Sequence, residues 1–266
     1  MKLSVSLLQM DIVFGKPEEN RKKVQDFVKQ AMRDKPDVIV LPELWDTGYD
    51  LTRLQDIGDV DGKEGMALLS SLAKQYNVNI VGGSIAKRTD EGTTNTTFVF
   101  DRQGNNVGEY SKVHLFRLMD EEKYLVPGES TGFFHIDEVS CANFICYDIR
   151  FPEWVRLHAA KGAHVLFVTA EWPKPRVEHW RSLLISRAIE NQSYVIACNR
   201  VGHDPNNEFG GHSMIISPWG EIVVEGDTSE TILNGTIDVQ DVEHVRKTIP
   251  IFEDRLPSLY EKYEKN

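Results

Sequence analysis

The stretch 141–153 reads Cys-Ala-Asn-Phe-Ile-Cys-Tyr-Asp-Ile-Arg-Phe-Pro-Glu, and it joins an apolar run to the start of a helix. A short apolar run bounded by turn residues is typical of a buried strand, and proline favours the first turn of a helix. The stretch therefore predicts a strand over 141–146 and a helix over about 152–161. A second apolar run at 164–169 predicts another strand, and this alternation is typical of an α/β fold.

The same patterns extend over the rest of the chain. Amphipathic periodicity predicts further helices at about 17–34, 62–76 and 177–192. Apolar and alternating runs predict strands at 2–9, 38–41, 78–86, 96–100, 107–113, 193–198, 212–216, 221–225 and 231–237. A short helix and a polar tail from about Ile251 follow. Because several neighbouring strands are joined by short turns, we expect mixed sheets rather than wholly parallel ones.

The composition is that of a folded protein with a large core. The 266 residues are 41% hydrophobic and 27% charged, and we expect one domain over 1–266 with a C-terminal extension from about residue 240. The net charge of -11 argues against a surface for nucleic acid or anionic membrane, because such surfaces gather Lys and Arg. No run approaches the ~20 apolar residues that span a bilayer. Three cysteines behind an N-terminus unlike a signal peptide predict reduced thiols and a cytoplasmic location.

The three cysteines have different surroundings in the sequence. Cys141 and Cys198 lie within apolar strands, where a cysteine usually packs as a small hydrophobic residue. Cys146 ends its strand ahead of a turn and a helix start, so we expect an exposed thiol near backbone N–H groups that favour the thiolate. The spacing of five also sends the side chains of Cys141 and Cys146 to opposite faces.

Three segments together resemble the motifs of the nitrilase-like carbon-nitrogen hydrolase superfamily. They are Val-Leu-Pro-Glu-Leu-Trp at 40–45 with Glu43, Gly-Glu-Tyr-Ser-Lys-Val-His-Leu-Phe at 108–116 with Lys112, and the segment that begins at Cys146. They occur in the order and spacing of the superfamily, and the similarity runs from about residue 3 to 240. The resemblance implies an α-β-β-α sandwich, in which two mixed sheets are flanked by helices.

The resemblance also implies a role for each of these residues. Cys146 would attack an amide carbon and form a thioester with release of ammonia, while Glu43 would carry the protons and later activate water. A carboxylate suits such a role only where burial or a neighbouring charge raises its pKa above about 4. Lys112 and the backbone N–H of Tyr147 would stabilise the oxyanion, a task that suits a compact ammonium.

The superfamily often adds a second glutamate on the loop after the lysine. In this chain the loop 117–128 offers Glu121 and Glu122, and its spacing to Pro127 favours Glu121 without excluding Glu122. Arg117 is a candidate for binding a substrate carboxylate, because a guanidinium can do so with two parallel hydrogen bonds.

A second pocket segment is expected after the strand at 164–169. Glu171 and Trp172 lie where the superfamily places substrate-pocket residues, although many relatives have a small polar residue in place of Glu171. Asp148 and Arg150 are expected to brace the turn at Cys146 rather than to touch substrate.

Within the superfamily the chain is most similar to bacterial omega-amidases of the methionine-salvage type. That resemblance implies hydrolysis of the distal amide of 2-oxoglutaramate or 2-oxosuccinamate by a homodimer with C-terminal segments exchanged or packed across its interface. No cofactor is expected, and the chain has no CxxC or HExxH spacing that would favour a metal site. An N-carbamoyl amino acid or aliphatic amide hydrolase of the same superfamily is an alternative. A Cys-His hydrolase, using one of eight histidines, and a catalytically inert interaction protein are the alternatives from other classes.

Overall fold

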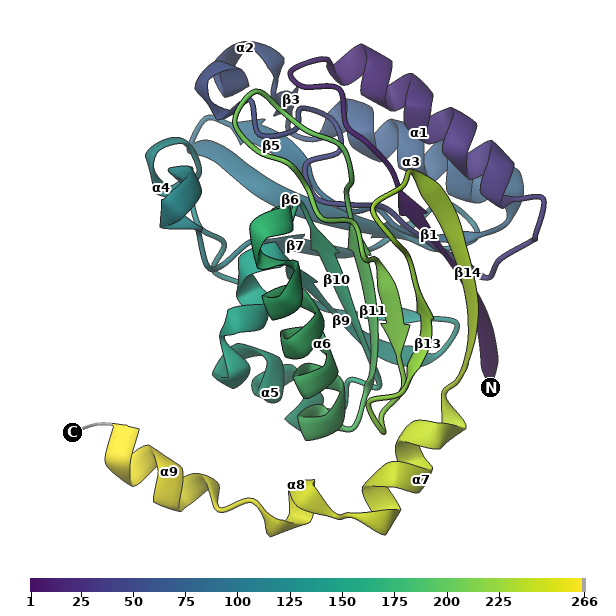
Figure 1. Ribbon diagram of the computed structural model, residues 1–266, viewed down its shortest axis with the longest axis vertical. Coiled ribbons are helices and arrows are strands. Elements are labelled where there is room, and N and C mark those ends of the chain that lie inside the picture. The colour runs from purple at the N-terminus through teal and green to yellow at the C-terminus, as the bar shows by residue number, and fades with distance from the viewer. Residues whose placement is uncertain (265–266) are drawn as a thin grey trace.

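The computed structural model describes residues 1–264 and contains two mixed sheets packed against each other (Figure 1). The first sheet has the order β14-β1-β2-β4-β6-β5-β3, with β7 paired to β6. Its neighbours β1, β2 and β4 are parallel, and the other pairs except β3–β5 are antiparallel. The strands are β1 (Lys2–Gln9), β2 (Val38–Val40), β3 (Asp59–Val60), β4 (Asn79–Val81), β5 (Ile85–Thr89), β6 (Gly92–Phe100), β7 (Asn106–Ser111) and β14 (Thr231–Asp238).

The second sheet has the order β13-β12-β11-β10-β9-β8. Its three central strands are parallel, whereas β8, β12 and β13 join as antiparallel neighbours. The strands are β8 (Phe133–Ile136), β9 (Val139–Ile145), β10 (Val165–Ala170), β11 (Tyr194–Asn199), β12 (Met214–Ile216) and β13 (Ile222–Glu225). The expectation of mixed sheets is confirmed.

Helices cover the outer face of each sheet. On the first sheet, α1 (Pro17–Ala31) and α3 (Lys63–Tyr76) bury apolar side chains against β1, β2, β4 and β6. On the second sheet, α5 (Pro152–Ala160) and α6 (Val177–Asn191) pack against β9, β10, β11 and β12 (Figure 1). Each helix presents an apolar stripe to its sheet, as an amphipathic helix must to bury its face. The expected α-β-β-α sandwich is therefore confirmed.

The central core lies between the two sheets. It joins apolar side chains of β1, β2 and β4 from the first sheet to those of β9, β10 and β11 from the second. Cys141 and Cys198 lie in this layer, whereas Cys146 lies in the separate cluster between the second sheet and its helices. The two thiols of the 141–146 stretch thus face different layers, as the strand period predicts.

The predicted strand at 78–86 is wrong in one respect, because the chain breaks it into β4 and β5. Gly82 and Gly83 make the break, and Gly83 has a φ of +59°, a conformation that side chains other than glycine rarely adopt. A Cβ atom on Gly83 would also lie 2.0 Å from the carbonyl oxygen of Pro42. The break therefore lets this turn approach the residues that follow β2.

The C-terminal part of the chain differs from the polar tail that the sequence suggested. After α7 (Gln240–Thr248), it forms α8 (Ile251–Asp254) and α9 (Pro257–Glu264), which extend away from the sheets as an arm (Figure 1). The remaining short helices are α2 (Leu54–Ile57), α4 (Glu121–Tyr124) and the 3-10 turns η1 (Leu51–Arg53), η2 (Arg117–Met119), η3 (Cys146–Arg150) and η4 (Lys174–Arg176). None of the helices in residues 1–264 is both long and apolar enough to cross a membrane.

Candidate active site

Glu43 follows β2 and is held by the turn that separates β4 from β5. The backbone N–H of Ser84 donates to the Pro42 carbonyl at 3.1 Å, and the Ser84 hydroxyl accepts the N–H of Leu44 at 2.9 Å. The Ser84 carbonyl accepts the N–H of Trp45 at 3.0 Å. These bonds on both sides of Glu43 fix the backbone that carries its fully buried side chain.

Cys146 begins a tight turn at the end of β9. Its φ of +47° is rare for a residue with a side chain, so the surrounding contacts must maintain it. Asp148 supplies them: its Oδ2 accepts the N–H of Ile145 at 2.9 Å and the hydroxyl of Tyr110 at 2.7 Å, and its Oδ1 accepts the N–H of His114 at 3.1 Å. Asp148 therefore braces the turn, in agreement with the expectation from the sequence.

A buried cluster of charges forms beside Cys146. The Lys112 ammonium, which follows β7 directly, donates to Glu43 Oε1 at 2.8 Å and to Glu121 Oε1 at 2.7 Å. All three side chains are fully enclosed. The structure thus brings together Glu43, Lys112, Glu121 and Cys146 from four separate parts of the chain.

Glu43 has further donors around its carboxylate. Oε1 accepts the Asn95 amide at 2.8 Å, and Oε2 accepts the backbone N–H of Glu171 at 2.8 Å. The Tyr49 hydroxyl lies 3.3 Å from Oε1. Because each contact comes from a buried group, the carboxylate is held in one orientation.

The charges in this cluster act on one another. Burial by itself lowers the pKa of Lys112, but the charges of Glu121 and Glu43 outweigh it and hold that pKa well above its usual value. Burial and then the nearby Glu43 charge raise the pKa of Glu121, although Lys112 opposes them. The ammonium has three N–H donors, and its two bonds to the glutamates leave the third for a further acceptor.

The expectation of an exposed Cys146 that is readily ionised is wrong. The residue is only 4% exposed, and burial together with the Glu43 charge raises the pKa of the thiol well above its usual value. A thiol in a low-dielectric site next to two carboxylates resists ionisation. A reaction at the Cys146 sulfur would therefore require a base that removes the thiol proton as the sulfur reacts.

The structure distinguishes between the two candidate glutamates of the 117–128 loop. Glu121 is enclosed in the cluster, whereas Glu122 is exposed. Histidine is not part of this arrangement: among residues 1–264, the charged side chains that act most strongly on Cys146 are Glu43, Lys112 and Glu121. A Cys-His pairing has no support from this geometry.

A pocket opens beside Cys146, and two arginines line it. Its walls are Phe116, Met119, Cys146, Tyr147, Arg150, Trp172, Pro173 and Arg176. The Arg150 guanidinium stacks over Trp172 at 4.7 Å, and the Arg176 guanidinium lies 5.5 Å from the centre of the Phe116 ring. Within residues 1–264, neither guanidinium is ion-paired with a carboxylate.

The positions of two arginines correct the interpretation of the sequence. Arg117 is exposed and lines a neighbouring groove with His114 and Leu118, which shares Phe116 and Tyr147 with the pocket at Cys146. Arg150, which we expected to brace the turn, faces the pocket instead. Burial lowers the pKa of Arg150, and the like charge of Arg176 lowers it further, so the two cations lie close enough to interact.

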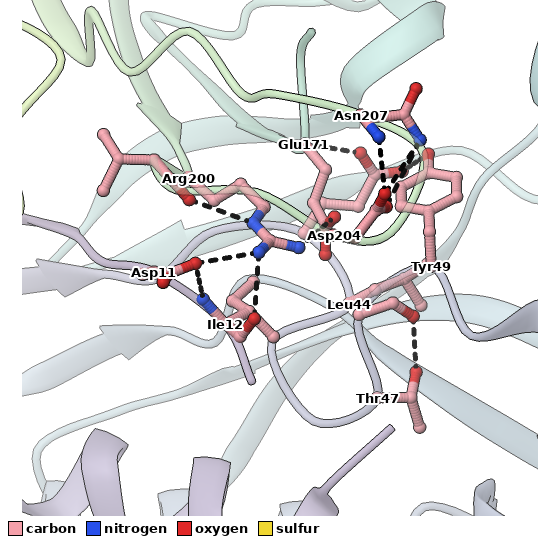
Figure 2. Close-up of polar contacts among 12 residues, drawn as sticks. Asp11, Ile12, Leu44, Thr47, Tyr49, Glu171, Arg200, Asp204 and Asn207 are labelled. Atoms are coloured by element: carbon pink, nitrogen blue, oxygen red, sulfur yellow. Dashed lines mark hydrogen bonds and ion pairs between the residues drawn. The ribbon is translucent and has the colours of Figure 1, made fainter. Parts of the chain in front are cut away.

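Trp172 and Glu171 follow β10 but differ in their surroundings. Trp172 lines the pocket, whereas Glu171 is fully buried behind Glu43 and does not. Glu171 Oε2 accepts Arg200 Nη1 at 2.8 Å, and Arg200 Nη2 donates to Asp11 Oδ1 at 2.9 Å. Figure 2 shows the Arg200 guanidinium directed toward Asp11 and Ile12, with Glu171 and Tyr49 in the same region. Glu171 is thus a supporting residue and is not a wall of the pocket.

Four residues of the site were not predicted from the sequence: Tyr49, Asn95, Arg176 and Arg200. Tyr49 and Asn95 contact Glu43, Arg176 lines the pocket, and Arg200 holds Glu171. No local pattern singles them out, because each reaches the site only through tertiary packing.

Comparisons with known proteins agree with this fold. The family model for carbon-nitrogen hydrolases matches residues 4–247. The chain is 50% identical to a 2-oxoglutaramate amidase of Bacillus subtilis (strain 168) over 98% of this chain and 100% of the relative. It is 31% identical to omega-amidase NIT2-A of Xenopus laevis over 99% of both chains. The crystal structure of Saccharomyces cerevisiae Nit3, of branch 10 of the nitrilase superfamily, matches with a TM-score of 0.87 at 28% identity and covers 94% of each chain.

Proposed function

Because this chain belongs to the carbon-nitrogen hydrolase family, we propose that it is an omega-amidase that hydrolyses the distal amide of 2-oxoglutaramate or 2-oxosuccinamate. The family and its amidase relatives make the chain a hydrolase of carbon-nitrogen bonds other than peptide bonds. The choice of substrate and the role of each residue are our proposal.

The observation that carries the substrate proposal is the pair of arginines beside Cys146. Arg150 and Arg176 line the pocket without a carboxylate partner in residues 1–264, so they are available to an anionic ligand. A guanidinium binds a carboxylate through two parallel charged hydrogen bonds. An amide whose other end carries a carboxylate, as both proposed substrates do, places that charge at the arginines while its amide carbon reaches the thiol. The relatives named as 2-oxoglutaramate amidase and omega-amidase support the same choice.

In the acylation step, Cys146 attacks the amide carbon. Glu43 takes the thiol proton as the carbon–sulfur bond forms, and the carbonyl oxygen becomes an oxyanion. The third N–H of Lys112 and the backbone N–H of Tyr147 stabilise that charge. Glu43 then returns the proton to the amide nitrogen, the carbon–nitrogen bond breaks, and ammonia leaves a thioester on Cys146.

In the deacylation step, water occupies the space that ammonia has left. Glu43 removes a proton from the water as its oxygen attacks the thioester carbon, and Lys112 again stabilises the oxyanion. Collapse of this intermediate breaks the carbon–sulfur bond. The sulfur regains its proton from Glu43, and the product is the 2-oxo dicarboxylic acid.

An ammonia-release panel tests the proposed substrate. It compares 2-oxoglutaramate and 2-oxosuccinamate with glutamine, N-carbamoyl amino acids, simple aliphatic amides and nitriles, with Cys146→Ala as the inactive control. The proposal expects the two 2-oxo omega-amides to give the highest kcat/KM. Equal ammonia release from 2-oxoglutaramate and from propionamide would refute it.

Arg176→Gln tests the arginine pair. Loss of a charged hydrogen-bonding group worth about 1.5–3 kcal/mol should lower kcat/KM for 2-oxoglutaramate roughly ten- to hundredfold. Propionamide has no carboxylate, so its slow turnover should change little. Arg117→Gln is the matched control, because Arg117 is exposed outside the pocket and its loss should leave both activities unchanged. Equal losses of kcat/KM for the two amides would show that Arg176 does not bind the substrate carboxylate.

The C-terminal arm supports a further proposal, that two copies pair as a homodimer. The arm carries large apolar side chains that solvent contacts in the single chain, namely Leu256, Leu259, Tyr260 and Tyr263. Burial of apolar surface is the main favourable term in association, and cyclic pairs are the commonest oligomers.

We also propose a cytoplasmic location, which the three free cysteines support.

Shortening the chain after Ile249 tests the role of the arm. We expect the full chain to elute as a dimer and the shortened chain as a monomer when light scattering measures the mass. Circular dichroism provides the control, since α7 and both sheets remain and the folded signal should persist. A shortened chain that still elutes as a dimer would place the interface elsewhere.

A further inference from the structure

The hydroxyl of Tyr49 lies between the two glutamates of the buried cluster. Its oxygen is 2.6 Å from Glu121 Oε1 and 3.3 Å from Glu43 Oε1. A phenol has one O–H, so the shorter contact receives its hydrogen and Tyr49 donates to Glu121. The residue is 8% exposed and is not a wall of the pocket at Cys146.

The surroundings of Tyr49 fix both its ring and its proton. The ring stacks on Phe209 with 6.5 Å between centroids, and the Arg200 guanidinium lies 4.1 Å from the centre of the Phe209 ring. Burial first, and then the charges of Glu121 and Glu43, raise the pKa of Tyr49 well above its usual value. The hydroxyl therefore keeps its hydrogen and acts as a donor.

Glu121 depends on this hydroxyl for one of its three donors. The other two are the Lys112 ammonium at 2.7 Å from Oε1 and the backbone N–H of Phe116 at 2.8 Å from Oε2. Hydrogen bonds to a carboxylate favour its ionised form. Without Tyr49, two donors would remain for a fully buried carboxylate.

Glu43 has the same number of close donors without the hydroxyl. They are Lys112, the Asn95 amide and the backbone N–H of Glu171, each at 2.8 Å. Two carboxylates that share one ammonium compete for the next proton, and the carboxylate with fewer donors takes it more readily. Tyr49 thus gives the Glu121 carboxylate the same number of close donors as the Glu43 carboxylate has.

We propose that Tyr49 is a positioning residue that keeps Glu121 ionised on Lys112, so that Glu43 is the carboxylate that takes and returns the catalytic proton. This inference rests on the proposed roles of Glu43 and Lys112. The proposed role also accounts for the longer contact, that of the Tyr49 oxygen with Glu43 Oε1 at 3.3 Å. When Glu43 carries a proton, the Tyr49 oxygen can accept a hydrogen bond from it, because the hydrogen of Tyr49 points to Glu121.

The pH dependence follows from the groups that face Glu121. These are Lys112, Glu43, Tyr49 and, through its charge when ionised, Cys146. Burial raises the pKa of Glu121 and the Tyr49 hydrogen bond opposes it, so removal of the hydroxyl moves this pKa upward. If activity requires ionised Glu121, acidification should therefore inactivate the variant at a higher pH than it inactivates the parent enzyme.

Tyr49→Phe is the test, since it removes only the hydroxyl. A hydrogen bond to a charged group is worth about 1.5–3 kcal/mol, so kcat for ammonia release should fall roughly ten- to hundredfold. Because Tyr49 does not line the pocket, KM should stay within about twofold. The acid limb of the pH profile of kcat/KM should shift to higher pH.

Two controls separate positioning from a general loss of stability. Tyr194→Phe removes another largely buried hydroxyl that donates to a carboxylate, Asp241, far from the cluster. It should leave the pH profile unchanged, and thermal unfolding measures stability for both variants. If the hydroxyl acts through Glu121, it should have little effect once Glu121 is replaced. The kcat of the Tyr49→Phe, Glu121→Gln double variant should then lie within about twofold of that of Glu121→Gln alone.

Failure of the proposed role of Tyr49 can be distinguished from failure of the proposed substrate. If the parent enzyme prefers an amide other than 2-oxoglutaramate, the same ratio of variant to parent is measured on that amide. An acid limb that does not move in Tyr49→Phe, or fully additive losses in the double variant, would overturn the role of Tyr49 even where the substrate is as proposed.

Discussion

Glu43→Gln should lower the rate of ammonia release by roughly a hundred- to ten-thousandfold, the usual contribution of a general acid–base group. The amide keeps the shape of the carboxylate but cannot take the thiol proton. The Cys146 thiol is buried and its pKa is raised, so without a base it remains protonated and weakly nucleophilic. Steady-state ammonia release gives the rate, and intact-protein mass spectrometry should detect no thioester on Cys146.

The matched control for Glu43→Gln is Glu122→Gln. Glu122 is an exposed glutamate next to the cluster in sequence, so its substitution should leave kcat and KM unchanged. Thermal unfolding checks that Glu43→Gln remains folded, because the amide can still accept from Lys112 or Asn95 through its oxygen. A variant that keeps more than about a tenth of the parent rate would mean that another group is the base.

Lys112→Met should reduce both activity and stability. Loss of one oxyanion donor lowers kcat by about a hundred- to a thousandfold in comparable sites. Removing one partner of a buried ion pair costs about 3–5 kcal/mol, and here two enclosed carboxylates lose the ammonium that binds them both. Kinetics and urea unfolding measure the two effects separately.

The pH dependence of the Lys112→Met variant gives a further check. Burial already raises the pKa of Glu121, and loss of the ammonium raises it further. An acid whose pKa is higher in the folded state binds more protons when folded, so stability falls as the pH rises toward and through that pKa. The loss of unfolding free energy should therefore be larger at pH 8 than at pH 5.

A double variant provides the control for this interpretation. Lys112→Met with Glu121→Gln removes one of the uncompensated charges and should recover part of the lost stability, while activity stays low. If the double variant were less stable than Lys112→Met by the full cost of a second substitution, the two side chains would not be coupled as the structure indicates.

The sequence by itself determined the layered fold and indicated Glu43, Lys112 and Cys146 as candidate residues of the site. Apolar runs and helix periodicity depend on the local chain, so they predicted most strands and the four long helices. Motif segments placed Glu43, Lys112 and Cys146 at strand ends, and the structure brings them together with Glu121. The predicted strand boundaries were wrong where the local pattern carried no signal of a break. At Gly82 and Gly83 the break depends on a close approach to Pro42.

Only the tertiary structure decided which side chains complete the site. Glu121 rather than Glu122 enters the cluster, and Arg176 rather than Arg117 lines the pocket. The burial that raises the pKa of Cys146 comes from layers distant in sequence, so a strand-end position alone wrongly predicted exposure. Local sequence sets the direction of a side chain within its strand or turn, whereas contacts such as that of Tyr49 with Glu121 depend on how separate segments pack.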